Sequence, residues 1–182
     1  MKTEIRDLWS YWGQADAVCI TTNGFVKNSG LAIMGAGNAK QAKDRFPGVE
    51  RNYGSLLKRE GHKVQVIPGT QTNLLDAVQT ALVAFPTKPV MWRIRNTTDL
   101  SHVLPAYRHQ FNIGHEVPGW MCFSSRRLIE ASAGQLFRLA CEQNWQSIIL
   151  PCPGVGNGGL HMSEVMPILE AYLDDRFTMV YR

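Results

Sequence analysis

The chain has 182 residues, of which 45% are hydrophobic and 19% are charged. This length suits one domain with a sizeable core, and the composition excludes a disordered, low-complexity or repeat protein. The formal net charge of +4 comes from scattered Lys and Arg rather than from a basic block, so it favours anionic partners only mildly. The opening "MKTEIRDLWSYWG" has no signal-peptide pattern and no run long enough to cross a bilayer. We therefore expect a cytoplasmic monomer with no membrane partner.

Short β-branched runs alternate with helical patterns, which is typical of an α/β layer fold. An edge strand is expected at the start of the chain, over residues 2–7. Further strands are expected over 16–22, 63–67, 80–85 and 147–151, and a last one over 175–182.

Helices are expected between these strands, because apolar residues recur there at helical spacing. A first helix has Ala39, Ala42 and Phe46 on one face, and a second opens at Pro47 and ends at Gly61. The apolar positions of the second helix are Val49, Tyr53, Leu56 and Leu57.

Two more helices are expected in the second half of the chain. The longer one, from about Ser125 to Asn144, buries Ile129, Ala133, Leu136 and Ala140. The last one presents Val165, Ile168, Leu169 and Tyr172 to the sheet. These helices must cover both faces of the sheet.

Residues 102–123 show no clear period and mix aromatic residues, histidines and prolines. The segment is either a structured loop or lid over the fold or an ordinary surface insertion.

The four cysteines have no C-x-x-C spacing, and two lie in apolar, strand-like stretches. They are Cys19, Cys122, Cys141 and Cys152. Buried free thiols are expected rather than disulfides or a zinc site. No cluster of His, Cys and carboxylates is evident, so we expect no metal and no cofactor.

Residues 154–159, "GVGNGG", follow a strand and precede a helix. They satisfy the dinucleotide-binding pattern G-x-G-x-x-G, but only one helix and one strand remain after them, too little for the cofactor crevice. No Lys-Ser or Lys-Thr follows the glycines, so a P-loop is excluded as well. Two readings remain: a backbone anion site at a helix N-terminus, or a purely structural turn.

A second glycine-rich stretch, "MGAGNAKQAKDRF" at 34–46, again precedes a helix and comes after a strand. Both stretches belong at the carboxyl ends of strands, where open α/β sheets bind ligands. Two such turns suggest a ligand with two phosphates.

The stretch "ADAVCITTNGFVKNSGLAIMGAGNAKQAKDRFP", together with "ILPCPGVGNGGL" and "PILEAYLDDRF", resembles the macrodomain family of ADP-ribose binders. The resemblance is closest to the branch of DNA ADP-ribosyl glycohydrolase antitoxins and small bacterial and viral macrodomains. It implies a three-layer α/β/α sandwich with a mixed central sheet. It also implies a single macrodomain over 1–182, with residues 102–123 as an insertion, and ADP-ribose or an ADP-ribosylated molecule as partner.

The resemblance also implies the ligand-binding residues. Asp7 matches the acidic residue that faces the adenine amino group, although Arg6 replaces the usual glycine and Asp7 could equally be a solvated carboxylate. Asn23 matches the asparagine that faces the distal ribose, and its alternative role is an Asn-Gly turn. The full expected set is Asp7, Leu8, Thr22, Asn23, Gly35, Ala36, Gly37, Pro153, Gly154, Val155, Gly156, Asn157, Gly158 and Gly159.

Lys88, in "AFPTKPVMWR", matches the catalytic lysine of the glycohydrolase antitoxins, although the spacing to Trp92-Arg93 is longer here. A partly desolvated lysine could attack C1″ as an amine or act on the leaving base. The alternative is a surface lysine on a loop.

His161 departs from the family, whose active members commonly have Asp-Trp after "GNGGL" where this chain has His161-Met162. A histidine could act as a general acid or base near neutral pH, or it could merely hydrogen-bond the loop. The expected catalytic set is therefore Lys88, His161 and Asn23.

The replaced aspartate leaves three functions open. The chain is a hydrolase that removes ADP-ribose from a modified nucleic acid or protein, a non-catalytic binder of ADP-ribose-type nucleotides, or an ADP-ribose 1″-phosphate phosphatase. Several arginines in or beside residues 102–123 would suit a nucleic-acid backbone, although solvated surface arginines explain them equally well. These are Arg93, Arg95, Arg108, Arg126 and Arg127.

Overall fold

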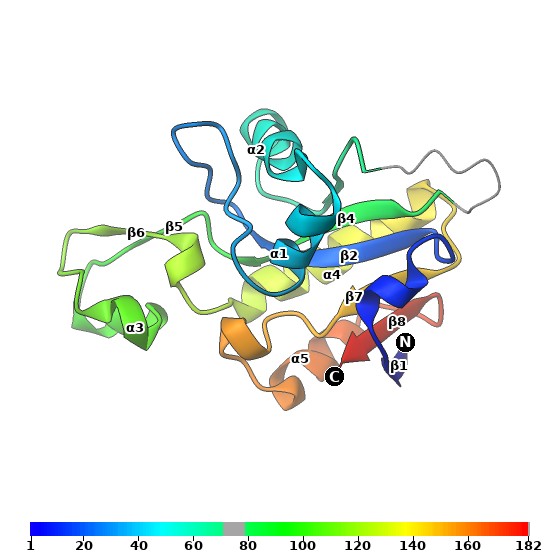
Figure 1. Ribbon diagram of the computed structural model, residues 1–182. Coiled ribbons are helices and arrows are strands. Elements are labelled where there is room, and N and C mark those ends of the chain that lie inside the picture. Colours follow the sequence, from blue (N-terminus) through cyan, green and yellow to red (C-terminus); the bar gives the residue numbers. More distant parts are fainter. Residues whose placement is uncertain (71–78, 182) are drawn as a thin grey trace.

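The computed structural model describes residues 1–70 and 79–181 and is built around one six-stranded sheet (Figure 1). The strand order is β1-β8-β7-β2-β4-β3, and only β3 runs antiparallel to its neighbour. The strands are β1 (Lys2–Ile5), β2 (Ala17–Asn23), β3 (Gln65–Val66), β4 (Ala81–Lys88), β7 (Ile148–Pro151) and β8 (Phe177–Tyr181). All six fall within or close to the expected ranges, and β1 is an edge strand as predicted. Arg182, the end of the predicted last strand, lies outside the described residues.

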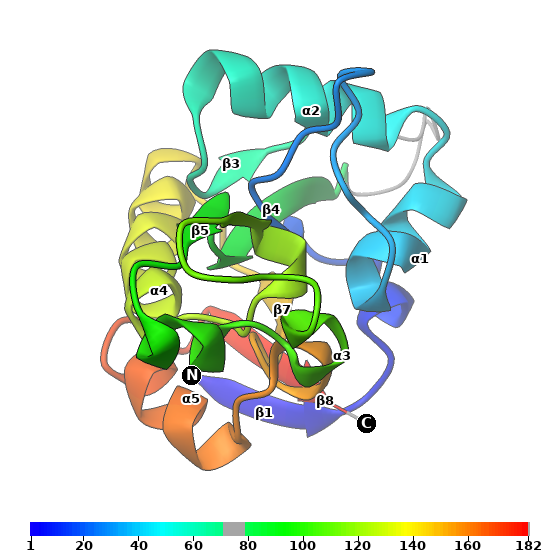
Figure 2. The ribbon, with the colours of Figure 1, turned by 90° about the vertical axis from the view of Figure 1, so that its left-hand side faces the viewer.

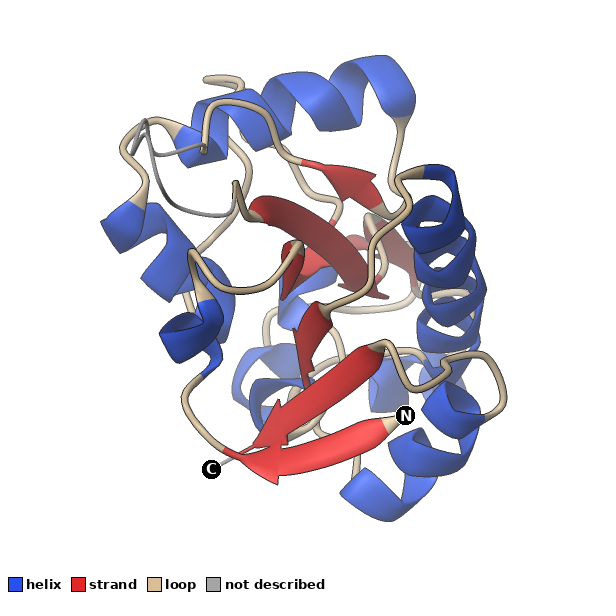
Figure 3. Cartoon of the chain, turned by 90° about the vertical axis from the view of Figure 1, so that its right-hand side faces the viewer, coloured by secondary structure: helices blue, strands red, loops and turns tan. Residues whose placement is uncertain are grey.

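Helices cover both faces of this sheet (Figure 3). One face carries α1 (Gly37–Arg45) and α2 (Val49–Glu60), and the other carries α4 (Arg126–Glu142) and α5 (Met162–Glu170). Alternate residues of β2 pack against the two helix layers, because successive side chains of a strand point to opposite faces of the sheet. Val18 and Ile20 join the cluster beneath α1 and α2, while Ala17 and Cys19 join the cluster beneath α4 and α5. The predicted three-layer α/β/α fold with a mixed sheet is confirmed.

Three local expectations need correction. Helix α2 begins at Val49 rather than at Pro47, because Gly48 adopts a φ of 85° and forms the N-cap. Tyr172 does not face the sheet: it follows the end of α5, is 39% exposed, and donates a hydrogen bond to Glu130 of α4. Cys141 is a free thiol as expected, but it is exposed, near the end of α4.

The segment predicted as an excursion begins earlier than expected, at β5 (Met91–Arg93), which pairs with β6 (Glu116–Pro118) in a second, two-stranded sheet. Three short helices accompany these strands: η2 (Thr97–His102), α3 (Pro105–Arg108) and η3 (Gly119–Met121). The segment has a small hydrophobic cluster of its own, centred on Ile94, Val103, Val117 and Cys122. We call residues 91–123 the insert. Figure 2 shows it in front of the main sheet, near the end of β4.

In the described residues, none of the helices has the length and apolar character needed to cross a membrane.

Candidate functional site

The first glycine-rich turn leads directly into α1. Ala36 is the N-cap in an extended conformation, and Gly37 begins the helix with a φ of 55°. Backbone N–H groups in the first turn of a helix have no intrahelical acceptor and carry its positive dipole end. The side chain of Asn38 holds this turn against β2, because its Oδ1 accepts from the backbone N–H of Thr21 at 2.9 Å and from its hydroxyl at 3.0 Å. The helix end is thus fixed at the carboxyl end of β2.

The second turn, residues 154–159, needs glycine at several places. Gly154, Gly156 and Gly159 have φ values of 80°, 70° and 74°, which L side chains rarely adopt. A Cβ on Gly159 would also lie 2.2 Å from the ring of Phe123. The turn contains η4 (Gly156–Gly158) and is closed by a 3.0 Å bond from the N–H of Leu160 to the carbonyl of Gly154.

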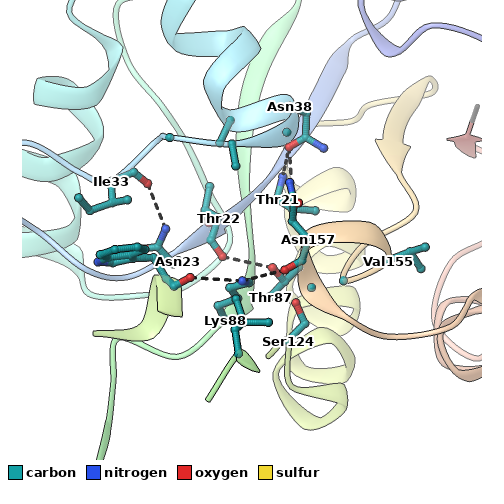
Figure 4. Close-up of a pocket in the computed structure, with 18 of the residues that line it drawn as sticks. Thr21, Thr22, Asn23, Ile33, Asn38, Thr87, Lys88, Ser124, Val155 and Asn157 are labelled. Carbon is teal, nitrogen blue, oxygen red and sulfur yellow. Dashed lines mark hydrogen bonds between the residues drawn. The ribbon is translucent and has the colours of Figure 1, made fainter. Parts of the chain in front are cut away.

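The two turns face each other across a cavity. A Cβ built on Gly37 would lie 3.8 Å from Nδ2 of Asn157, while one on Gly35 would meet nothing within 4 Å. The cavity has a volume of about 420 Å³, a size typical of small-molecule sites. Figure 4 shows its lining, in which α1, the ends of β2 and β4 and the second turn converge.

Lys88, the last residue of β4, extends across this cavity. Its ammonium donates to the backbone carbonyl of Asn157 at 3.0 Å and to that of Trp120 at 3.4 Å. Burial lowers the pKa of Lys88 below its ordinary value, and the nearby thiol of Cys122 opposes this to a lesser extent. No ion pair holds Lys88 within the described part of the chain. The site thus contains a lysine ammonium whose pKa is lowered by desolvation. Its hydrogen-bond partners are two neutral backbone carbonyls.

Comparison with known proteins adds to this geometry. No family model matches the chain, and no curated protein matches its sequence. Solved structures do match. The macrodomain of Mycobacterium tuberculosis DarG is 24% identical with a TM-score of 0.65, over 100% of this chain and 97% of that one. The macrodomain of Thermus aquaticus DarG is 23% identical with a TM-score of 0.64, over 100% and 97%. The chain has the macrodomain fold.

A third match is the structure described as Thermosipho africanus DarTG in complex with ADP-ribose, which is 18% identical with a TM-score of 0.67. The match covers 98% of this chain and 41% of that one, so the present chain spans less than half of the DarTG chain.

Ten of the residues predicted from the sequence line the macrodomain cavity. They are Thr22, Asn23, Gly35, Ala36, Gly37, Lys88, Gly154, Val155, Asn157 and Gly158. The amide of Asn23 is already engaged, because Nδ2 donates to the carbonyl of Ile33 and Oδ1 accepts from the N–H of Phe25, each at 3.0 Å. Asn23 therefore braces the loop that follows β2 and keeps one amide hydrogen and one lone pair for a ligand.

The other predicted residues are placed outside the cavity lining. Asp7 precedes the short helix η1 (Leu8–Tyr11), and its carbonyl accepts from the N–H and hydroxyl of Ser10. Leu8 is buried in the core, and Pro153 is buried beside the second turn. Gly156 and Gly159 shape this turn through their backbone conformation.

His161 is also outside the cavity lining. It is the exposed N-cap of α5, and its backbone N–H donates to the carboxylate of Glu164 at 2.9 Å. Its side chain is therefore not among the groups that face Lys88 in the cavity.

A further group of residues, not predicted from the sequence, reaches the cavity from separate segments of the chain. They are Thr21, Ile33, Asn38, Ala39, Thr87, Leu104, Tyr107, Trp120, Ser124 and Cys152. Asn38 stands inside the glycine stretch already quoted, so its position was a usable signal. Tyr107 and Trp120, whose rings make an edge contact with centroids 5.4 Å apart, had no such signal because the insert lacks a period.

A second cavity of about 730 Å³ lies at the N-terminus of α4 and shares Ser124 with the first. It is lined by the Trp92 and His102 rings, whose centroids are 4.4 Å apart, and by Arg126 and Arg127. Arg126 also contacts the carboxylate of Glu164 at 3.5 Å. This cavity combines aromatic surface with guanidinium groups.

Across residues 1–70 and 79–181, no group of three or more His, Cys, Asp or Glu is arranged as a metal site.

Proposed function

We propose that this macrodomain binds ADP-ribose in the first cavity. The two glycine-rich turns support a diphosphate between them, because each offers backbone N–H groups and α1 adds the positive end of its dipole. The match to a DarTG structure described as a complex with ADP-ribose supports the same ligand. We further propose that the chain acts as a cytoplasmic monomer without a cofactor.

The proposed reaction is hydrolysis of the bond between C1″ of ADP-ribose and an acceptor. Lys88 carries this proposal: it is a partly desolvated amine at the end of a central strand, between the second turn and the insert. A lysine whose pKa is lowered has more neutral amine, which can attack C1″, while its protonated form can donate to the leaving group. The turns themselves contribute no titratable side chain to the cavity lining.

For the acceptor, we propose a group on a nucleic acid or a protein, lying near the insert. The second cavity supports a nucleic acid, because aromatic rings can stack on a base and guanidinium groups pair with phosphates. Arg126 pairs with Glu164, whereas Arg127 has no carboxylate partner among the described residues.

One observation favours the second candidate, a non-catalytic binder. No carboxylate is present among the described residues that line the first cavity, and His161 lies outside the lining. A hydrolase would then rely on Lys88 alone. An ADP-ribose 1″-phosphate phosphatase is a third candidate, because the same cavity would accept that nucleotide.

Calorimetry tests binding, and turnover assays separate the candidates. Clear heat with ADP-ribose and none with NAD or ATP is the expected result, and absence of heat with ADP-ribose would refute the binding proposal. Release of ADP-ribose from a modified oligonucleotide or protein would establish the hydrolase. Release of phosphate from ADP-ribose 1″-phosphate would identify the phosphatase, and binding without either product would identify the binder.

A further inference from the structure

Ser124 carries a buried hydroxyl group without a hydrogen-bond partner. The residue is 8% exposed, and its Oγ has no partner among the described residues. Leaving a buried polar group unsatisfied is costly, so such groups in folded proteins usually meet a ligand or water. Ser124 lines the first cavity, which raises the question of what its hydroxyl binds.

The backbone around Ser124 is fixed on two sides. Its N–H donates to the carbonyl of Gly158 at 2.8 Å, and the N–H of Ser125 donates to the carbonyl of Thr87 at 2.9 Å. Ser124 therefore joins the second turn to the end of β4, next to Lys88. The neighbouring carbonyl of Asn157 accepts from Lys88 at 3.0 Å.

Gly158 leaves room beside this hydroxyl. A Cβ on Gly158 would lie 2.4 Å from Oγ of Ser124, so a side chain there would displace the hydroxyl. Figure 4 shows the oxygen of Ser124 on the side that faces Lys88 and Asn157. The hydroxyl thus lies beside the turn, at the Lys88 end of the cavity.

We propose that Ser124 Oγ hydrogen-bonds a hydroxyl of the distal ribose of ADP-ribose, as a binding residue at the reacting end of the cavity. A serine hydroxyl both donates and accepts, which matches a ribose hydroxyl. The phosphates have the N–H groups of the two turns, so they do not need this oxygen. The inference rests on the proposed binding of ADP-ribose.

Ser132, in α4, provides a matched control, since it is a second buried serine close in the chain to Ser124. It is 1% exposed, and its hydroxyl donates to the carbonyl of Pro86 at 2.8 Å, outside the cavity lining. Ser124→Ala removes a hydroxyl without a partner, whereas Ser132→Ala removes a satisfied one. The two variants should therefore have opposite profiles.

The experiment measures thermal unfolding and calorimetric affinity for ADP-ribose and for ADP, which lacks the distal ribose. Ser124→Ala should lower affinity for ADP-ribose roughly three- to ten-fold, which corresponds to the loss of one hydrogen bond. Its affinity for ADP should be unchanged, and its Tm should be unchanged or slightly higher. Ser132→Ala should lower the Tm and leave both affinities unchanged.

Three outcomes would overturn the inference. Equal loss of ADP and ADP-ribose affinity in Ser124→Ala would assign the hydroxyl to a phosphate, and a lower Tm with unchanged affinities would assign it to the fold. Unchanged Tm with unchanged affinities would show that the hydroxyl contacts no ligand. Absence of ADP-ribose binding by the native chain would instead refute the proposed function, and this inference with it.

Discussion

The ammonium of Lys88 donates a hydrogen bond to the backbone carbonyl of Asn157 at 3.0 Å, which ties the end of β4 to the second glycine-rich turn. A carbonyl dipole stabilises the charged lysine, while burial opposes the charge and lowers the pKa. The lysine is thus held in place without a carboxylate that would fix its proton.

Lys88→Ala is expected to abolish release of ADP-ribose from a modified oligonucleotide or protein and to change affinity for free ADP-ribose less than three-fold. Transition-state stabilisation and uniform binding are separable, and we place the nucleotide mainly on the two turns. Single-turnover assays and calorimetry measure the two effects. Lys88→Arg, which keeps the charge but cannot act as an amine nucleophile, should be equally inactive. Normal turnover in either variant would remove the lysine amine from the mechanism.

Gly35→Asp is expected to lower affinity for ADP-ribose at least ten-fold. A Cβ on Gly35 meets nothing within 4 Å, so the side chain fits, and the added carboxylate lies where we place the diphosphate. Gly35→Asn adds nearly the same volume without the charge and should have a smaller effect on affinity. Calorimetry at two salt concentrations compares them. Equal losses in both variants would indicate steric blocking and would count against a diphosphate at this turn.

Trp120→Ala is expected to weaken binding of an ADP-ribosylated oligonucleotide or peptide more than binding of free ADP-ribose. Its ring belongs to the insert and contacts Tyr107, while its backbone carbonyl, which holds Lys88, is retained in the variant. Trp145→Ala, far along the chain beyond α4, is the control for loss of an indole. Parallel affinity measurements with both ligands test the difference. Equal loss for the two ligands would show that the insert does not contact the acceptor.

The elements that sequence predicted well are those with local causes. The β-branched, apolar run of β2, the helical spacing in α4 and the glycines at 61 and 154 are local signals, so the layers and both turns could be predicted. The fold of the insert could not, because Ile94 and Val117 meet only when β5 pairs with β6.

The same distinction applies to the candidate site, where only residues in local motifs could be predicted from the sequence. Lys88, Asn23 and the glycines lie in motifs, whereas Trp120 comes from the insert and Ser124 from the junction between the insert and α4, where no motif marks them. The motif at Asn23 also could not indicate that its amide is bonded to Ile33 and Phe25, because those contacts depend on the path of the following loop.

His62→Leu is expected to reduce the loss of stability between pH 7 and pH 4. Burial lowers the pKa of His62 from 6.5 to about 4, so the unfolded chain takes up its proton first as the pH falls. The free energy of unfolding therefore begins to fall near pH 6.5, and the fall is complete near pH 4 and amounts to about 3 kcal/mol. Chemical denaturation across this range measures it, with His109→Leu as the exposed control. An unchanged pH profile in the His62 variant would refute the prediction.

His161→Asp separates a structural role for this residue from a catalytic one. As the N-cap of α5, an aspartate should stabilise the helix by about 0.5–1 kcal/mol, because its carboxylate accepts from the first-turn N–H groups and favours the helix dipole. A modest rise in Tm is therefore expected, together with turnover at least as fast as in the native chain.

His161→Ala should lower the Tm slightly, and it should leave turnover unchanged if Lys88 acts alone. A large loss of turnover in the alanine variant at unchanged ADP-ribose affinity would instead assign histidine to the reaction. An inactive native chain that gains turnover with His161→Asp would identify the natural protein as a binder that lacks one carboxylate.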